Sequence, residues 1–358
     1  MNPARLLLCL LALLAGGCST VDYYGQALRG QLDLLVAADP VEDLLADPGT
    51  DPELAARLRE AGALLDFAAQ ALGLPAGGSY RDYAALGRDY VVWNVFAAPE
   101  FALEPERWCY PLVGCLAYRG YFDPVSAEHE ATRQRALGHD VHVAGAVAYS
   151  TLGWLDDPLL DTFLFRRRDR LAELLFHELA HRRLFVAGDT LFNESYATAV
   201  ATEGVRRWLL AQGDAALLAR RDTEVARRDA VVALLLELRA SLEALYRQPL
   251  DPAAMRAAKA ARLAGAQAEY AALRAGWAAD AGYDAWMAAG LNNAKLGTVG
   301  LYHRLVPGFQ ALLAQQGGDL EAFHTAVAAL AQQPEDRRHA RLAALAAQWP
   351  ASAGAHSD

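Results

Sequence analysis

Cysteine is scarce in this 358-residue sequence, which has only four. Cys9 and Cys18 lie near the N-terminus, so only one pair, Cys109 and Cys115, is left for the rest of the chain. A zinc ribbon needs two such pairs, and a single pair therefore argues against that kind of metal site. In an oxidising compartment, we expect a disulfide between Cys109 and Cys115 instead.

Basic residues are not in excess either. Asp and Glu number 43 against 33 Lys and Arg, which gives a formal net charge of −10 at pH 7. No basic stripe runs along the sequence, so we expect no nucleic-acid partner. The arginine-rich stretches RRRDR and ARRDTEVARRD are interleaved with acids and are typical of solvated helix faces.

Long apolar runs are absent apart from Leu6 to Ala15, which is too short to span a bilayer comfortably. Its place after Arg5 is that of the apolar part of a signal peptide. The following LAGGC, which ends at Cys18, resembles the lipobox of bacterial lipoproteins, whose cysteine is lipidated and begins the mature protein. Ala15 stands three residues before the cysteine, where Leu is usual, so an ordinary secretory signal is the alternative.

The lipobox resemblance implies export to the cell envelope. We expect a signal peptide over 1–17, then a lipid anchor and tether over 18–30 with the lipid on Cys18. Ser19 follows the cysteine, where Asp would oppose sorting to the outer membrane. The expected location is therefore the periplasmic face of a membrane, reached through the lipid anchor and most consistent with the outer membrane.

The body of the chain has the pattern of one α+β domain over 31–350, predominantly helical and with a small mixed β-sheet. Hydrophobic residues make up 54% of the sequence, enough for a sizeable core. Val-rich and aromatic stretches bounded by Gly and Pro predict strands at 88–100, 107–122 and 140–154. Helical patterns predict helices at 23–45, 51–72, 161–184, 192–212, 214–247, 252–279, 283–290, 298–316, 319–332 and 335–348, and one after Asp123 as N-cap.

These elements divide the domain into three parts. A β-containing part covers about 88–154, two helices with the metal-binding pattern cover about 161–212, and a large helical half covers about 214–348. The remaining tail, 351–358, is expected to be disordered.

The stretch HELAH, residues 177–181, places two histidines four residues apart on a predicted helix. Both imidazoles then leave the same face of the helix, at a separation that one metal ion can bridge. Glu178 lies beside the first histidine, where it can act as general base without binding the metal. His177 and His181 are therefore candidate Zn²⁺ ligands and Glu178 is the candidate catalytic base. The alternative is a pair of solvated histidines on an amphipathic helix.

A catalytic zinc site usually has three protein ligands, so the histidine pair needs a third. Glu194 and Glu203 are the downstream candidates. If the first helix ends near Leu184 and the chain then reverses, an antiparallel helix from about Asn193 brings Glu194 level with the histidines. Glu203 would lie roughly 13 Å further along at 1.5 Å per residue. We therefore expect Glu194 to be the third ligand, with Glu203 behind the ligands or at the surface.

Several stretches of the chain resemble known zinc peptidases. FNESYA, which contains Glu194, is similar to the NEGFA segment of the aminopeptidase N superfamily, whose glutamate is the third zinc ligand. GAVAYS, about thirty residues before HELAH, is similar to that superfamily's GAMEN segment, an edge strand that binds the substrate backbone.

A second resemblance covers roughly residues 18–310, almost the whole chain. This part is similar to a family of bacterial lipoproteins called putative aminopeptidases. The shared stretches are the lipobox followed by YYGQ, VVWNVFAAPEF, WCYPLVGC with YRGYF, AYSTLGWLDDP, FHELAH, FNESYA and LNNAKL. Together they are far more specific than HExxH alone.

These resemblances imply a gluzincin-like zinc peptidase core, Zn²⁺ as cofactor and a peptide as substrate. They also imply that Gly145, Ala146 and Ala148 contact the substrate backbone. The glutamate of GAMEN grips the free amine of the substrate, but Ala148 stands at the matching position. If the protein is an aminopeptidase, another carboxylate must therefore hold the amine.

Related zinc peptidases supply a Tyr or His from a later helix to stabilise the oxyanion. Tyr302 and His303 are the candidates here, and we choose Tyr302, with an ordinary core or surface tyrosine as the alternative. Asn292 and Asn293 either line the same cleft or cap a helix. Glu173 is interpreted as an exposed helix carboxylate rather than a group that orients a ligand. The other histidines are expected at the surface: His129, His139, His142, His324, His339 and His356.

Three functions are compatible with these patterns. The first is a zinc-dependent peptidase, of the aminopeptidase type, at the periplasmic side of the envelope. The second is a zinc-dependent endopeptidase or cell-wall amidase with the same ligands and base. The third is a non-catalytic envelope lipoprotein with a vestigial metal site, against which Glu178 argues because metal binding alone does not need it. The sequence indicates neither the substrate sequence nor an oligomeric state.

Overall fold

The structure is a computed structural model that describes residues 23–110, 114–149, 155–277 and 282–348. The predicted signal peptide, the predicted lipidation site Cys18, the tail over 351–358 and the end of the β-rich stretch predicted over 140–154 lie outside these residues. Within the described part of the chain, no helix combines the length and the apolar character needed to cross a membrane.

The N-terminal part departs from the single helix predicted over 23–45. A helix covers 23–36, but the chain then becomes extended in β1 (Ala38–Pro40) and forms the short helix α2 (Val41–Ala46). A proline disfavours the helical conformation of the residue before it, so Pro40 explains why one helix does not run through.

The chain is predominantly helical with a small β component, as predicted, but the strands form three small sheets among the described residues rather than one, and β1-β2-β8 is the mixed one. The largest sheet is antiparallel with the order β6-β3-β7, a second has the order β1-β2-β8, and the third is the hairpin β4-β5. The stretch predicted to be β-rich over 107–122 contributes three short strands, β4, β5 and β6, of which β4 and β5 pair antiparallel. The bounds are β2 (Asp82–Ala84), β3 (Val92–Pro99), β4 (Trp108–Tyr110), β5 (Gly114–Leu116), β6 (Arg119–Tyr121), β7 (His139–Ala146) and β8 (Leu159–Leu160).

The hairpin carries the cysteine pair. Cys109 of β4 and Cys115 of β5 are opposite each other in the register and are joined by a disulfide. The covalent link closes a small ring at the end of the β-containing part, next to the loop around Gly188: a Cβ added at Gly114 would lie 2.9 Å from the Gly188 backbone nitrogen.

Most predicted helices are present, but two more are split besides the one predicted over 23–45. The helix predicted over 161–184 is divided at 165–167, and the one over 298–316 is divided before Pro307, whose ring lacks the N–H that a continuous helix needs. The bounds are α3 (Pro52–Ala71), α4 (Pro124–Ala136), α5 (Asp161–Leu164), α6 (Arg168–Arg183), α7 (Thr190–Gln212), α8 (Ala215–Tyr246), α9 (Pro252–Ala275), α10 (Asp284–Ala288), α11 (Asn293–His303), α12 (Val306–Gln315), α13 (Leu320–Ala331) and α14 (Glu335–Gln348). As predicted, the carboxylate of Asp123 caps α4.

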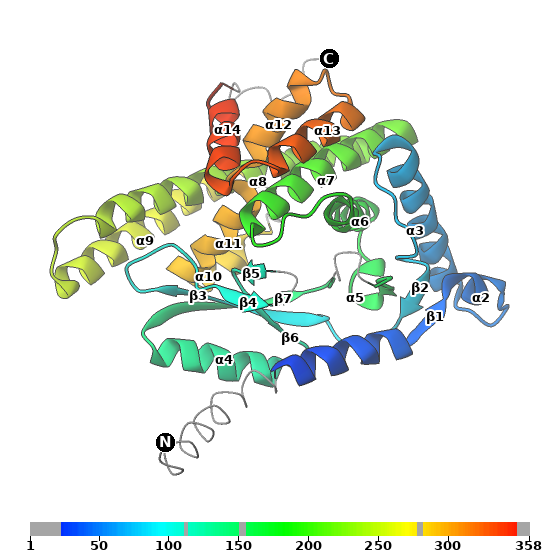
Figure 1. The fold of residues 1–358 in the computed structure, drawn as a ribbon, viewed down its shortest axis with the longest axis horizontal. Helices are drawn as coiled ribbons and strands as arrows, with labels where there is room; N and C mark the ends of the chain where they lie inside the picture. The colour runs from blue at the N-terminus through cyan, green and yellow to red at the C-terminus, as the bar shows by residue number, and fades with distance from the viewer. Residues whose placement is uncertain (1–22, 111–113, 150–154, 278–281, 349–358) are drawn as a thin grey trace, which may run out of the picture.

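The elements are arranged around the antiparallel sheet. Figure 1 shows this sheet in the lower half of the molecule, with α4 beneath it and α6 and α7 above it. Helix α11 packs against β3 and β7 and also against α7 and α8, so it links the sheet to the helical half. The largest apolar core lies among α3, α6, α7 and α12–α14, where Leu58, Phe176, Phe192, Phe309 and Phe323 are fully buried.

Helices α6 and α7 were predicted to be antiparallel, but they are not. Figure 1 shows α6 along its axis, whereas α7 runs across the view, so the two helices cross steeply. Small residues allow close contact: Ala197 and Ala201 of α7 are buried, and a Cβ on Gly204 would lie only 2.9 Å from the ring of Phe176. Nearer its beginning, α7 meets α6 beside the HELAH histidines, where Glu194 contacts His177.

Candidate active site

The two histidines of HELAH lie near the end of α6, on the same face of the helix. Nε2 of His177 is 3.2 Å from Nε2 of His181, as the i, i+4 spacing predicts. His181 is buried and His177 is partly buried. The two ring nitrogens are therefore directed at one point beside the helix.

Glu194 brings a carboxylate to this point from α7. Its Oε2 lies 3.2 Å from Nε2 of His177 and 3.6 Å from Nε2 of His181. The helix begins at Thr190 rather than near Asn193, because the side chain of Asp189 caps it. Glu194 therefore lies in the second turn of α7 and not in the first turn as predicted.

These three side chains have the geometry and the chemistry of a zinc site. Their ligand atoms, two imidazole nitrogens and one carboxylate oxygen, lie within 4.8 Å of one another. Two histidines and one glutamate form one of the ligand sets found in catalytic zinc sites, which keep a fourth position open. His177, His181 and Glu194 therefore fit zinc as the residues that would hold it.

The charges at this point reinforce one another. Burial by itself raises the pKa of Glu194, but His181 and His177 outweigh burial and bring that pKa to about 2. Burial likewise lowers the pKa of His177, and the hydrogen bond and charge of Glu194 outweigh it, so that this pKa is raised. Glu194 is thus an ionised carboxylate held between two imidazoles.

Glu178 follows the first histidine and lines the cavity into which the three candidate ligands open. Burial raises the pKa of Glu178, the two histidines oppose this rise, and the charges of Glu194 and Asp157 add to it. Its carboxylate lies beside the candidate ligands without belonging to their group. A carboxylate in this place is a candidate general base.

Two other glutamates of this region bind arginines. Glu203 accepts hydrogen bonds from Arg206 and Arg207 of its own helix, which agrees with its exclusion as a ligand. Glu173 is not the exposed carboxylate that was predicted, because Arg221 binds it with both Nη atoms and Arg170 with a third contact. Burial by itself raises the pKa of Glu173, but these arginines bring it to about 2.

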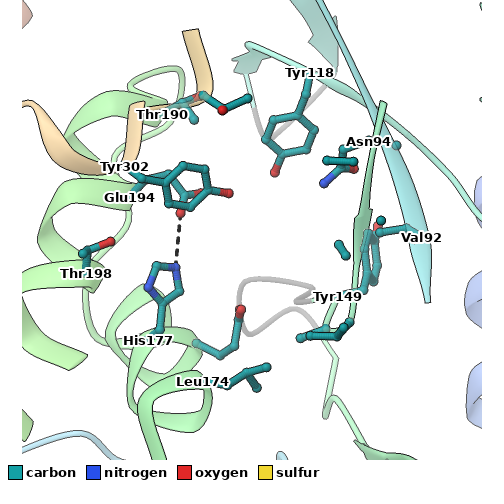
Figure 2. Close-up of a pocket in the computed structure, with 18 of the residues that line it drawn as sticks. Val92, Asn94, Tyr118, Tyr149, Leu174, His177, Thr190, Glu194, Thr198 and Tyr302 are labelled. Carbon is teal, nitrogen blue, oxygen red and sulfur yellow. Dashed lines mark hydrogen bonds and ion pairs between the residues drawn. The ribbon is translucent and has the colours of Figure 1, made fainter. Parts of the chain in front are cut away.

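The three candidate ligands open into a cavity of about 1400 Å³. Figure 2 shows His177, Glu194 and Tyr302 on one wall, with Tyr118 and Asn94 on the opposite wall. The ring of Tyr302 stacks on that of His177 with 6.3 Å between the centroids. The charge of Glu194 and burial raise the pKa of Tyr302, so its hydroxyl stays protonated and can donate a hydrogen bond.

Tyr118 is a cavity residue that the sequence analysis missed. Its hydroxyl points into the cavity from the wall opposite Tyr302 (Figure 2). Burial raises the pKa of Tyr118, and the charge of Glu194 adds to this effect. Tyr118 is one of 14 tyrosines in the sequence, and its place in YRGYF predicts a strand residue rather than a site residue.

Strand β7 forms another part of the cavity wall, and Gly145, Ala146 and Ala148 all line the cavity. Among the described residues β7 pairs with β3 alone, so its other side is an edge. The ring of Tyr90 lies against Gly145, where a Cβ would be 2.3 Å from the ring. Ala148 lies two residues beyond the end of β7, and its methyl group replaces the carboxylate expected there.

The two asparagines before α11 have structural contacts. Asn292 caps α11 by accepting from the backbone N–H of Lys295, and it donates to the carbonyl of Val141. Asn293 is fully buried, donates to carbonyls at the end of β3 and accepts from the hydroxyl of Tyr246. Of the two alternatives considered for this pair, helix capping holds for Asn292, and neither residue lines the cavity.

Several histidines expected at the surface are partly or fully buried. His324 is buried against the hydroxyl of Tyr196, and His339 contacts the carboxylate of Asp189. His142 lines the cavity, where burial lowers its pKa to about 4. The remaining members of that set are His139, which is half-buried, His129, which is exposed as predicted, and His356, which lies outside the described residues.

His303 also lines the cavity. Burial and the charge of Arg228 lower its pKa to about 4, so it is a neutral imidazole near neutral pH.

A second group with metal-binding geometry consists of Asp189, Glu335 and His339, but Nε of Arg338 already donates to Asp189 at 2.6 Å. The HELAH group is the one that meets the cavity.

Comparison with known proteins agrees with this geometry. A family model with the description "Putative aminopeptidase" matches residues 22–342. These residues include α6, α7, β7 and α11, and therefore every element of the candidate site. Neither the curated proteins nor the solved structures gave a significant match. Because the family model covers most of its length, the chain belongs to this aminopeptidase family.

Proposed function

We propose that the protein is a zinc-dependent peptidase of the aminopeptidase type, anchored by lipid at the periplasmic face of the outer membrane. The observation that carries the proposal is the meeting of His177, His181 and Glu194 within 4.8 Å in a cavity that Glu178 also lines. Family membership supports peptidase activity at a general level.

The roles of the side chains follow from their positions around the cavity. Zinc held by the three ligands would polarise the substrate carbonyl and bring the pKa of a water to about 7. Glu178 takes the proton of the attacking water and delivers it to the leaving nitrogen. The hydroxyl of Tyr302 donates to the developing oxyanion, and the free edge at Gly145 and Ala146 aligns the peptide backbone as an added strand.

An endopeptidase or cell-wall amidase is the second candidate, and one observation favours it. The carboxylates among the described lining residues are Glu173, Glu178 and Glu194. Two of them belong to the proposed catalytic group, and Glu173 is bound by arginines. With Ala148 in place of the expected glutamate, none of these carboxylates is free to hold a substrate amine. A non-catalytic lipoprotein is the third candidate, and the presence of Glu178 argues against it.

Metal analysis and a peptide-library digest of the purified protein test the proposal. We expect about one zinc per chain, because one group of three ligands meets the cavity. Short peptides should be cleaved, and removal of the metal by a chelator should stop cleavage until zinc is restored. Undiminished cleavage by metal-free protein would contradict the proposal. Faster cleavage of free than of N-acetylated peptides supports an aminopeptidase, and equal rates support the second candidate.

The intact mass of the mature protein tests the lipid anchor. We expect the chain to begin at Cys18 and to carry lipid on it, because LAGGC is similar to a lipobox. A Cys18→Ser variant should no longer fractionate with membranes. A different first residue, or an unmodified Cys18, would contradict the anchor and favour an ordinary secretory signal.

A further inference from the structure

One cationic side chain in the cavity wall, that of Arg166, has no ion-pair partner among the described residues. Arg166 lies two residues before the first residue of α6, lines the cavity and is exposed, so a ligand that enters can reach it. Burial and the neighbouring Arg170 lower the pKa of Arg166, and the charge of Glu173, which other arginines already bind, opposes this only in part.

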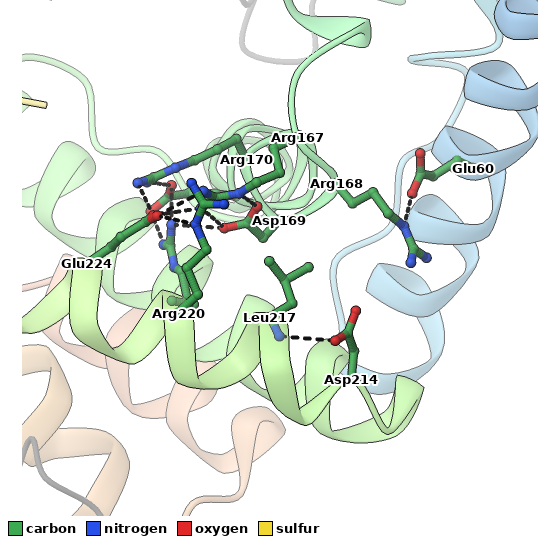
Figure 3. A network of polar contacts seen from close by, with 11 residues as sticks. Glu60, Arg167, Arg168, Asp169, Arg170, Asp214, Leu217, Arg220 and Glu224 are labelled. Atoms are coloured by element: carbon green, nitrogen blue, oxygen red, sulfur yellow. Dashed lines mark hydrogen bonds and ion pairs between the residues drawn. The ribbon is translucent and has the colours of Figure 1, made fainter. Parts of the chain in front are cut away.

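The arginines around it are already paired. Figure 3 shows Arg167 and Arg170 around the carboxylate of Glu224, with Nη2 of each arginine 2.6 Å from Oε2. This ion-pair network joins α6 to α8 through five arginines and four carboxylates: Arg167, Arg170, Arg220, Arg221 and Arg228 with Asp169, Glu173, Glu224 and Asp229. The network has no carboxylate to spare, so it leaves Arg166 available for an anion from outside.

We propose that Arg166 binds a carboxylate of the substrate, so that the site selects peptides carrying a negative charge on that side of the scissile bond. This proposal rests on the peptidase function proposed above. A guanidinium group binds a carboxylate with two parallel hydrogen bonds, and the two sources in a peptide are its C-terminus and the side chains of Asp and Glu. An aminopeptidase needs a free carboxylate to hold the substrate amine. The described part of this cavity wall has an unpaired cation instead.

The length of α6 sets the distance between this charge and the cleaved bond. Arg168, the first residue of α6, precedes His177 by about 14 Å along the helix axis, at 1.5 Å per residue. An extended peptide covers that distance with roughly four residues at 3.3 Å each. Peptides longer than about four residues are therefore long enough to span this axial distance.

Synthetic octapeptides made in matched versions test this proposal. Each sequence is prepared as a free acid and as a carboxamide, and with Glu or Gln at each position in turn, and kcat/KM is measured by mass spectrometry. A charged hydrogen bond predicts that wild-type protein prefers the charged version by roughly 10- to 100-fold, mostly through KM. A preference for the free acid identifies the C-terminus as the source, and a preference for Glu identifies a side chain.

The Arg166→Gln variant should lose this preference while it cleaves uncharged peptides at the wild-type rate. Its melting temperature should be unchanged, because Arg166 has no ion pair to lose. Arg59→Gln, which changes an exposed arginine of α3, is the matched control and should keep the preference. The same preference in wild type and Arg166→Gln would overturn the proposal and leave the peptidase function standing.

Binding separates this proposal from a failure of the peptidase function. If wild type cleaves no peptide, the function proposed above is wrong. The affinities of the free-acid and carboxamide peptides for the full protein, with and without Arg166→Gln, then decide the role of Arg166. Tighter binding of the acid that is lost in the variant supports the proposal, and equal or absent binding of both versions overturns it.

Discussion

Replacement of Glu178 by Gln is expected to abolish peptide hydrolysis while zinc and the fold are retained. The amide has nearly the size of the carboxylate and fits the same buried place beside His177, but it cannot accept a proton from water. General-base catalysis contributes roughly 10²- to 10⁴-fold, so kcat should fall by at least about 100-fold. Hydrolysis rate, zinc content and melting temperature of the variant are the three measurements.

Two tyrosine variants provide a graded comparison. Tyr302→Phe should lower kcat by roughly 10- to 1000-fold, since it removes one oxyanion donor and leaves the base in place. Tyr118→Phe, on the opposite wall, should have the smaller effect if Tyr302 is the oxyanion donor, and the order of the two effects would reverse if Tyr118 is the donor.

The Glu178→Gln result decides the mechanism independently of the tyrosines. If this variant hydrolyses peptides as fast as wild type, the proposed mechanism is wrong.

Replacement of Glu194 by Ala is expected to remove zinc from the purified protein. The Glu194 carboxylate lies 3.2 Å and 3.6 Å from the two histidine nitrogens, so its loss leaves two ligands where a catalytic site uses three. Zinc per chain, measured after dialysis against a weak chelator, should fall from about one to near zero. Peptide hydrolysis should be lost with it.

Glu203→Ala is the matched control for that variant. Glu203 is on the same helix and binds Arg206 and Arg207, so its removal should cost some stability and leave the zinc content unchanged. Full loss of zinc from Glu203→Ala, with zinc retained by Glu194→Ala, would show that the third ligand was assigned to the wrong glutamate.

The candidate ligands could be predicted because their relation is mostly local. The spacing of His177 and His181 requires only a helix, and a helix of 3.6 residues per turn fixes which face they share. Glu194 could be placed because only a short loop separates the two helices. The predicted direction of the second helix was wrong. The steep crossing depends on the close packing of the buried Ala197 and of Gly204, which lies against Phe176 of α6 and Leu72 after α3, and no local sequence pattern shows this packing.

The parts that could not be predicted depend on contacts between segments far apart in the sequence. The RRRDR stretch was interpreted as a solvated helix face, yet Arg167 and Arg170 bind Glu224, more than fifty residues away. Tyr118 reaches the cavity only because the sheet places it opposite Tyr302.

Two other departures from the prediction have local causes. Pro40 and Pro307, which interrupt predicted helices, are signals that could have been recognised in the sequence.

The residue that caps the helix carrying Glu194 is held by a segment that is synthesised much later. Asp189 caps α7 and also accepts a hydrogen bond from Arg338 of α14, 149 residues later. During synthesis every proposed ligand therefore leaves the ribosome well before the residue that secures α7. Assembly of the ligand geometry is tied to the arrival of α14, and a partly synthesised copy carries the whole HELAH motif without the finished site.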